Sequence, residues 1–115
     1  NPRYADAYYN RARSKAFSGD NYGAISDYSK AIEINPKYAK AYTNRCLVKY
    51  NIKDYYGAIS DCNKALQINP NAEYAHLNRG ISKEQIGDMK GACSDWRKAS
   101  SLGDEDASRW VRNQC

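Results

Sequence analysis

The sequence has little histidine, phenylalanine or methionine, with one residue of each among 115. No apolar run approaches the roughly 18 residues that a membrane-spanning helix needs, so we expect no membrane insertion in this segment. The start, Asn1-Pro2-Arg3-Tyr4, has neither an initiator methionine nor a basic-then-apolar signal sequence. We therefore expect the chain to be part of a longer protein.

Motifs for catalysis and for metal binding are also missing. The only histidine, His76, has no neighbouring ligand candidates, and the four cysteines show no C-x-x-C spacing. We find no nucleophile–base arrangement and no glycine-rich phosphate loop. We predict no metal site, no cofactor and no enzyme activity.

The cysteines are expected to be reduced. Cys46, Cys62 and Cys93 fall at positions where the helical pattern described below requires buried side chains, and a buried free cysteine behaves as a small hydrophobe. Cys115 is the last residue. Free thiols favour a reducing compartment such as the cytoplasm, although the compartment itself is not encoded in these residues.

What the sequence does contain is a repeat of 34 residues. The units start at Ala5, Ala39 and Glu73 and need no gaps; the first two agree at 18 of 34 positions, and all three agree at 11. Each unit has two apolar stretches of helical period separated by a short polar break, which predicts helix, turn and helix. In the first two units the second helix is expected to stop at Ile-Asn-Pro, because proline disfavours helical geometry in the residue before it.

Small residues recur where two helices must approach closely, such as Ala12, Cys46 and Gly80, and larger ones recur opposite them. With the spacing of 34, this pattern resembles the tetratricopeptide repeat family. The resemblance implies an all-α, right-handed superhelical solenoid of seven helices in one domain, residues 1–115. The shared Asn-Arg pair, followed sixteen residues after the arginine by Asp, resembles a bacterial, cyanobacterial form of the repeat.

The predicted repeats span residues 5–38, 39–72 and 73–106. Asn1-Pro2 stands 34 residues before Asn35-Pro36, so residues 1–2 are interpreted as the end of a preceding repeat. Beyond the third repeat, Ala107, Trp110 and Val111 lie at helical spacing among polar residues. Because the last unit of a repeat stack needs a polar cover, we predict a capping helix over about residues 105–115.

The family resemblance places a peptide-binding groove on the concave side, along the first helix of each repeat. Among the residues at the matching positions, the predicted groove residues are Tyr9, Asn10, Arg13, Phe17, Lys40, Asn44, Leu47, Tyr50, Asn51, Tyr74, Asn78 and Ile81.

Three asparagines, Asn10, Asn44 and Asn78, recur one repeat apart in this set. Each amide can donate to a carbonyl and accept from an N–H of a peptide backbone, so the series predicts a ladder that grips main chain. The alternative is that these amides bond within the hairpin or to water. The aromatic and aliphatic members are candidate side-chain anchors, or else core residues.

Arg11, Arg45 and Arg79 recur with Asp27, Asp61 and Asp95 at constant spacing. Because the hairpin brings the middles of its two helices together, we interpret each pair as an internal ion pair rather than a basic patch. Lys15, Lys49 and Lys83 follow one turn later without an obvious partner, which leaves a weak cationic stripe.

These features favour a scaffold or adaptor that binds a peptide or partner protein, with an acidic ligand suited to the net charge of +5. Co-chaperones of the family hold acidic chaperone tails with a two-carboxylate clamp. Of the clamp positions, only Asn44 carries the residue of the clamp. Tyr9, Arg13, Tyr74 and Asn78 stand at the other positions, which argues against a chaperone tail as the partner. Self-association is an alternative function, and nucleic-acid binding a weaker one because the basic residues are spread along the chain.

Overall fold

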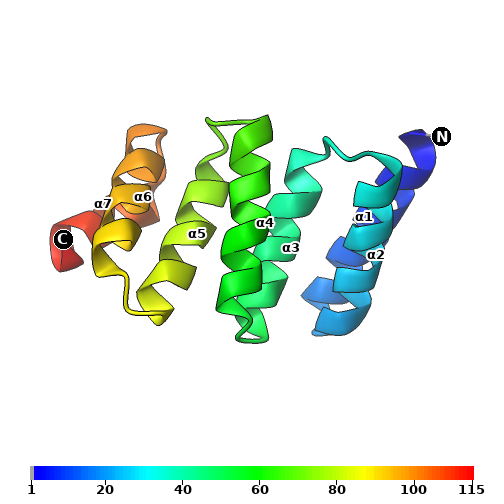
Figure 1. Ribbon diagram of the computed structural model, residues 1–115, viewed down its shortest axis with the longest axis horizontal. Coiled ribbons are helices and arrows are strands. Elements are labelled where there is room, and N and C mark those ends of the chain that lie inside the picture. Colours follow the sequence, from blue (N-terminus) through cyan, green and yellow to red (C-terminus); the bar gives the residue numbers. More distant parts are fainter. Residues whose placement is uncertain (1) are drawn as a thin grey trace.

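The computed structural model describes residues 2–115, which form seven α-helices and no strand. The helices are α1 (Pro2–Phe17), α2 (Asn21–Ile34), α3 (Ala39–Asn51), α4 (Tyr55–Ile68), α5 (Glu73–Gln85), α6 (Met89–Ser101) and α7 (Glu105–Gln114). They pair into three hairpins, α1–α2, α3–α4 and α5–α6, that stack along the long axis with α7 at the end (Figure 1). The predicted all-α solenoid of seven helices is confirmed.

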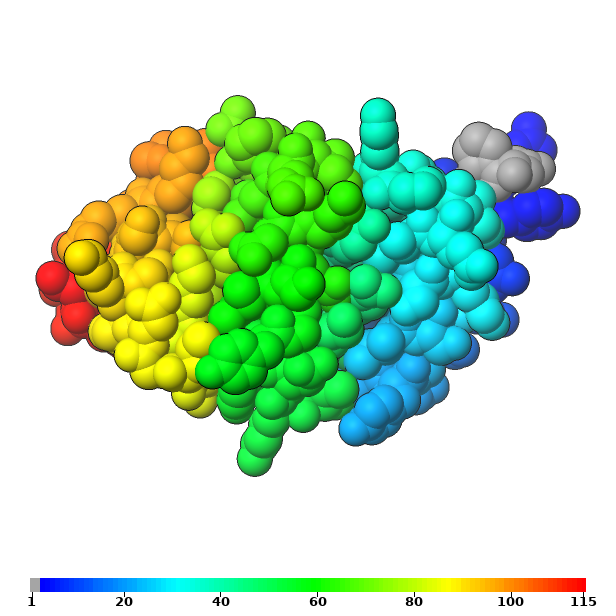
Figure 2. Space-filling view, viewed as in Figure 1, coloured from blue at the N-terminus to red at the C-terminus, as the bar shows by residue number. Residues whose placement is uncertain are grey.

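The stack forms one continuous body of 43 × 25 × 21 Å, along which the chain advances from one end to the other (Figure 2). Each hairpin contacts the next mainly through its second helix, so that α2 packs on α3 and α4 on α5. Within residues 2–115, no helix has both the length and the hydropathy needed to cross a membrane.

The second helix of each hairpin begins at an aspartate cap. The Asp54 carboxylate accepts a hydrogen bond from the amide of Gly57 at 3.0 Å, and a Cβ on Gly57 would overlap that carboxylate. The pairs Asp20–Gly23 and Asp88–Gly91 repeat the arrangement. The glycine after each turn therefore lets the cap carboxylate approach the helix backbone closely.

The α2 and α4 helices end as the Ile-Asn-Pro motif predicts. Asn35, the residue after α2, is extended, with φ −129° and ψ 90°. Asn69 follows α4 with nearly the same conformation, φ −136° and ψ 94°. Both residues precede a proline, which excludes the helical conformation there.

The turns inside the hairpins need a residue in the left-handed region of backbone conformation. Glycine supplies it in the first and third hairpins, with φ 90° at Gly19 and 86° at Gly87. The second hairpin has Lys53 at the same position, with φ 68°. A side chain is disfavoured in this conformation, so the turn before α4 is strained.

The predicted arginine–aspartate pairs are confirmed in all three hairpins. In the second hairpin Arg45 Nε and Nη2 donate to the two carboxylate oxygens of Asp61 at 2.8 and 2.7 Å. Arg11 binds Asp27 and Arg79 binds Asp95 in the same two-bond geometry. Each aspartate is buried, with 1 to 4% of its surface exposed, and links the first helix to the second.

The expectation that the three lysines lack partners is wrong. Lys15, Lys49 and Lys83 each place Nζ 3.0 to 3.1 Å from the same buried aspartate that the arginine binds. One carboxylate has two oxygens and several lone pairs, so it accepts from both cations. The lysines belong to the hairpin interior and form no cationic stripe.

Two of the arginines also join neighbouring hairpins. Arg45 Nη1 donates to the Ser29 hydroxyl of α2 at 3.0 Å, and Arg79 Nη1 donates to the Asn63 side chain of α4 at 2.9 Å. The same side chains therefore fix the packing within a hairpin and the contact with the one before it.

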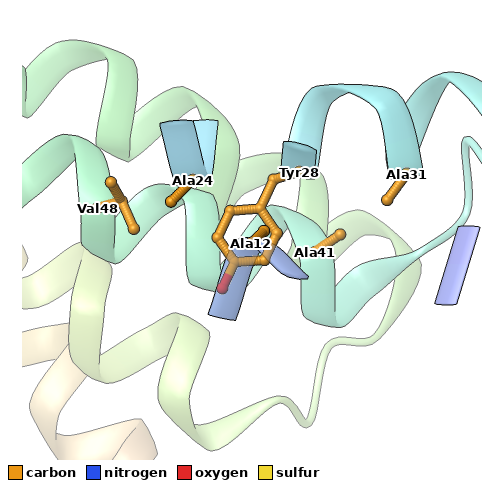
Figure 3. Packing of buried hydrophobic residues seen from close by; sticks show 6 residues of the cluster. All are labelled: Ala12, Ala24, Tyr28, Ala31, Ala41 and Val48. Atoms are coloured by element: carbon orange, nitrogen blue, oxygen red, sulfur yellow. The ribbon is translucent and has the colours of Figure 1, made fainter. Parts of the chain in front are cut away.

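The core is built mainly of alanines and aromatic rings. In the first hairpin Tyr28 inserts its ring among Ala12, Ala24 and Ala41 (Figure 3). In the third hairpin Trp96 takes the place of Tyr28, and Gly80 faces it where a Cβ would overlap the indole. Large and small side chains thus interlock, as expected from the repeat.

The expectation of reduced cysteines is wrong. Cys46 of α3 and Cys62 of α4 form a disulfide, as do Cys93 of α6 and Cys115 at the end of the chain, and no cysteine of the described chain is free. Burial was predicted correctly, because Cys46 and Cys62 are 0% exposed and Cys93 is 7% exposed. Since free thiols were the argument for a reducing compartment, that argument no longer holds.

The two ends of the stack differ. At the carboxyl end α7 packs on α6, with Ala107 fully buried and Trp110 edge-on to Trp96 at 5.2 Å between ring centroids. At the amino end Asn1 lies outside the described residues, and Pro2 is the first residue of α1 instead of part of a turn as at Pro36. Proline suits the first turn of a helix, where its missing N–H is not needed.

Replacing Lys53 by glycine should stabilise the chain, because it removes the strained left-handed lysine at a position where both other hairpins have glycine. The expected gain in unfolding free energy is only about 0.5–1 kcal/mol, because the greater entropy of glycine in the unfolded chain offsets part of the relieved strain. Urea denaturation measures it. The reverse change, Gly19→Ala, should destabilise by a similar amount; an unchanged or lower midpoint for Lys53→Gly would contradict the account.

Acid should remove part of the stability through Asp27. Hydrogen bonds from Arg11, together with Lys15, lower the pKa of Asp27 from 3.8 to about 2. The folded chain therefore binds the proton less readily than the unfolded chain, so this stabilisation is complete above about pH 4 and is lost as the pH falls towards 2. The loss is roughly 2 kcal/mol for one group shifted by this amount.

Urea midpoints measured between pH 5 and pH 2 test this effect. Asp27→Asn should be less stable at neutral pH and should lose less stability over the same range. An equal loss in the variant and the parent would assign the acid sensitivity to other groups.

Candidate functional site

The predicted groove residues lie on the first helix of each hairpin. Helix α3 is the central one of the three, because it contacts both α1 and α5. Asn44 borders two hollows, and most of the predicted groove residues line one or the other.

The larger hollow has a volume of about 500 Å³. Of the predicted groove residues, Tyr9 and Arg13 come to it from α1, Lys40 and Asn44 from α3, and Tyr74 from α5. The remaining walls are Ala39, Thr43, Asn69, Ala72 and Glu73. The hollow therefore spans all three hairpins.

The smaller hollow has a volume of about 290 Å³ and is more apolar. Its predicted members are Phe17, Leu47 and Asn51, and Arg13 and Asn44 border it as well. Its floor is made by Ala16, Tyr28 and Val48. Because Arg13 and Asn44 border both hollows, the two lie next to each other, and we call them together the channel.

Three tyrosines support the wall of the larger hollow. Tyr9 is stacked on Tyr38 at 4.9 Å between ring centroids and lies tilted against Tyr28 at 5.8 Å. Tyr38 donates its hydroxyl to Asp6 at 2.7 Å. Burial raises the pKa of Tyr28 to about 12, and burial together with the hydrogen bond to Asp6 raises the pKa of Tyr38, so both hydroxyls stay protonated.

The three asparagines do not form a ladder of equal groups. Asn10 is exposed and lines neither of the two hollows at Asn44; it borders another open hollow, of about 480 Å³, with Arg13, Ser14 and Phe17. Asn44 is partly buried and donates to the Tyr9 hydroxyl at 3.0 Å, which leaves its carbonyl oxygen available to a ligand. Asn78 is 6% exposed, and its amide points to the Thr43 carbonyl at 3.5 Å.

The cations of the channel are not neutralised by the chain. Within the described residues Arg13 and Lys40 form no salt bridge, in contrast to the six basic residues that bind the buried aspartates. Arg13 lies over the Tyr9 ring, with its guanidinium carbon 5.8 Å from the centroid. Glu73 is the only acidic residue that lines the larger hollow. The channel therefore has exposed positive charge next to aromatic surface.

The other predicted groove residues have different surroundings. Phe17 and Tyr74 are exposed, with 97% and 60% of their surfaces accessible. Tyr50 packs on the Cys46–Cys62 core and lies tilted against Tyr55, and burial raises the pKa of its hydroxyl. Ile81 packs against the core of the third hairpin. Neither Tyr50 nor Ile81 lines the two hollows.

Some lining residues were missed by the sequence pattern. Asn69 and Ala72 belong to the turn between α4 and α5, and Glu73 begins α5. The groove prediction used only residues of the first helices, so the turn residues Asn69 and Ala72 were not included. The described residues contain no group of His, Cys, Asp or Glu side chains able to hold a metal ion.

Family models of the tetratricopeptide repeat match the chain at residues 5–38 and 39–72. The chain belongs to the tetratricopeptide repeat (TPR) family. The curated proteins include no significant match to its sequence.

Solved TPR domains share the fold over nearly the whole chain. The first TPR domain of Spaghetti (RPAP3), bound to the HSP90 peptide SRMEEVD, has a TM-score of 0.93 at 23% identity, covering 97% of this chain and 90% of that one. The Arabidopsis OM64 TPR domain has a TM-score of 0.93 at 24% identity, covering 100% and 99%. The second TPR domain of human RPAP3, in complex with the HSP70 peptide SGPTIEEVD, has 0.90 at 23%, covering 97% and 96%. At these identities the likeness shows the fold.

Proposed function

We propose that this TPR domain is a protein-interaction module whose channel binds an acidic peptide segment of a partner protein. The observation that carries the proposal is the meeting of two hollows at Arg13 and Asn44, with unneutralised cations on one side and an apolar floor on the other. A ligand that fits has a carboxylate near Arg13 and Lys40 and an apolar side chain in the smaller hollow.

The charge distribution supports an acidic ligand. A carboxylate that approaches Arg13 replaces water at a guanidinium that has no acidic partner of its own in the described chain. Such charge-assisted hydrogen bonds are worth about 1.5–3 kcal/mol each. The positive channel also raises the rate at which an acidic segment encounters the domain.

Asn44 is suited to hold peptide main chain. Its amide nitrogen is held by Tyr9, which orients the side chain, and its carbonyl oxygen can accept from a peptide N–H. Asn10 is exposed at the edge of the channel and can add a second contact. Asn78 is buried, so we assign it a packing role in place of the predicted contact with ligand.

The acidic peptides in the similar structures, SRMEEVD and SGPTIEEVD, agree with an acidic ligand in general terms. The carboxylate clamp of the chaperone-binding subgroup is matched here only by Asn44, because Tyr9, Arg13, Tyr74 and Asn78 replace its other residues. We therefore propose a different acidic segment as ligand, held mainly between the first and second hairpins.

The nucleic-acid alternative is weakened by the ion pairs. Arg11, Arg45 and Arg79 and the lysines one turn later bind buried aspartates, so six of the 18 basic residues are not available to phosphates.

Selection of phage-displayed random heptapeptides against the domain tests the proposal, followed by calorimetric titration of a selected peptide. The selected sequences should combine Asp or Glu with an apolar residue. Arg13→Ala, Lys40→Ala and Asn44→Ala should each raise Kd about tenfold or more, as expected for one lost polar contact. Lys98→Ala, which removes an exposed cation of α6 outside both hollows, should leave Kd unchanged. Equal affinity in all four variants would refute the assigned site.

Self-association is the second candidate function, because Tyr22 and Tyr56 are 75% and 73% exposed at equivalent positions of α2 and α4. Large exposed aromatic side chains are common at protein interfaces. Light scattering over a concentration series should then show a dimer that Tyr22→Ser together with Tyr56→Ser dissociates. A constant monomer mass at high concentration would remove this candidate.

A further inference from the structure

The two helices of each hairpin meet at one recurring pair of positions. In the first hairpin the pair is Ala12 and Tyr28, and in the third it is Gly80 and Trp96. In both cases a small residue on the first helix receives a large ring from the second, and the ring is at most 2% exposed. The ring fills the space between the helices, which is how a hairpin reaches interior packing density.

The second hairpin has neither ring. Its pair is Cys46 and Cys62, both 0% exposed and joined as a disulfide. Two cysteine side chains have less volume than Ala with Tyr or Gly with Trp, so van der Waals contact alone would hold α3 to α4 less well. The covalent bond supplies the missing connection.

We propose that the Cys46–Cys62 disulfide takes the place of the core aromatic ring in the second hairpin and makes the peptide channel dependent on oxidation. The functional part of this inference rests on the channel proposed above.

The position of α3 explains the link to the channel. Lys40 and Asn44 reach the larger hollow from α3, and Leu47 and Asn51 reach the smaller one. Tyr50, on the same helix, packs directly against the disulfide cluster. In a repeat stack each hairpin contacts mainly the hairpins next to it, so loosening the middle one also uncouples the first from the third.

The chemistry is an ordinary thiol–disulfide exchange. A dithiol reductant transfers two electrons and two protons, so its two thiols become one disulfide while the bond between Cys46 and Cys62 is broken to give two thiols. Both sulfurs are shielded from solvent in the folded chain, whereas Cys115 of the second disulfide is exposed. The terminal bond is therefore reduced first, and the buried bond requires opening of the hairpin.

The test uses the full chain with Cys93→Ser and Cys115→Ser, so that only the buried bond remains. This chain is compared in its oxidised form and after unfolding and refolding with dithiothreitol. Reduction should lower Tm by at least about 8 °C, as expected for loss of a bond that closes a loop of this size. It should also speed hydrogen exchange of the α3 amides about tenfold or more.

The chain itself supplies the matched control. Cys46→Ala with Cys62→Tyr installs the pair of the first hairpin, and its Tm and exchange should be the same with and without dithiothreitol. Cys46→Gly with Cys62→Trp installs the pair of the third hairpin and replaces this control if the first does not fold. Cys46→Ser with Cys62→Ser cannot form the bond and should match the reduced chain.

The outcomes separate the two proposals. If the reduced chain keeps its Tm within about 2 °C and its α3 exchange is unchanged, the disulfide inference is wrong. If α3 loosens but the affinity for the phage-selected peptide is unchanged, the link between bond and channel is wrong. If no peptide binds in either state while Tm and exchange respond as expected, the proposed function fails and the role of the bond in the core stands.

Discussion

Each hairpin depends on one buried aspartate. Asp27, Asp61 and Asp95 lie between the helices with at most 4% of their surface exposed. A carboxylate can remain charged there only when cations and hydrogen bonds replace the water that it loses. Two bonds from an arginine and one contact from a lysine do so, and all come from the first helix. The carboxylate therefore determines which side of that helix faces its partner.

Because one side of each first helix faces the aspartate of its partner helix, the opposite side remains for the surface that carries the predicted groove residues. Tyr9, Arg13, Lys40 and Asn44 lie on that side and meet in one channel. The basic residues of the first helices therefore differ in their surroundings. Those at the positions of Arg11 and Lys15 in each repeat bind the buried aspartates, whereas Arg13 and Lys40 form no salt bridge within the described residues. The net charge of the chain does not tell which basic residues are paired inside the fold and which are exposed.

The fold was predictable because the helix–turn–helix pattern and the arginine–aspartate spacing occur three times. Arg45 and Asp61 are sixteen residues apart, and this spacing placed them opposite each other. Cys46 and Cys62 also have a separation of 16, one residue further along both helices. The same spacing therefore could have predicted the buried disulfide. The Cys93–Cys115 bond depends on where α7 packs, which no repeat specifies. Asn10, Asn44 and Asn78 stand at the same repeat position yet differ in burial, because Asn44 and Asn78 each contact the hairpin before them, whereas Asn10 is in the first hairpin of the described residues.

The central claim is that ligand binds at Arg13 and Asn44. Nuclear magnetic resonance of the ¹⁵N-labelled domain tests it most directly, by following side-chain signals while a phage-selected peptide is added. We expect the signals of the Asn44 amide and of Arg13 Nε to shift most, and the signal of the buried Asn78 amide to shift little. Largest shifts on α2 and α4 around Tyr22 and Tyr56, with Arg13 and Asn44 unmoved, would contradict it.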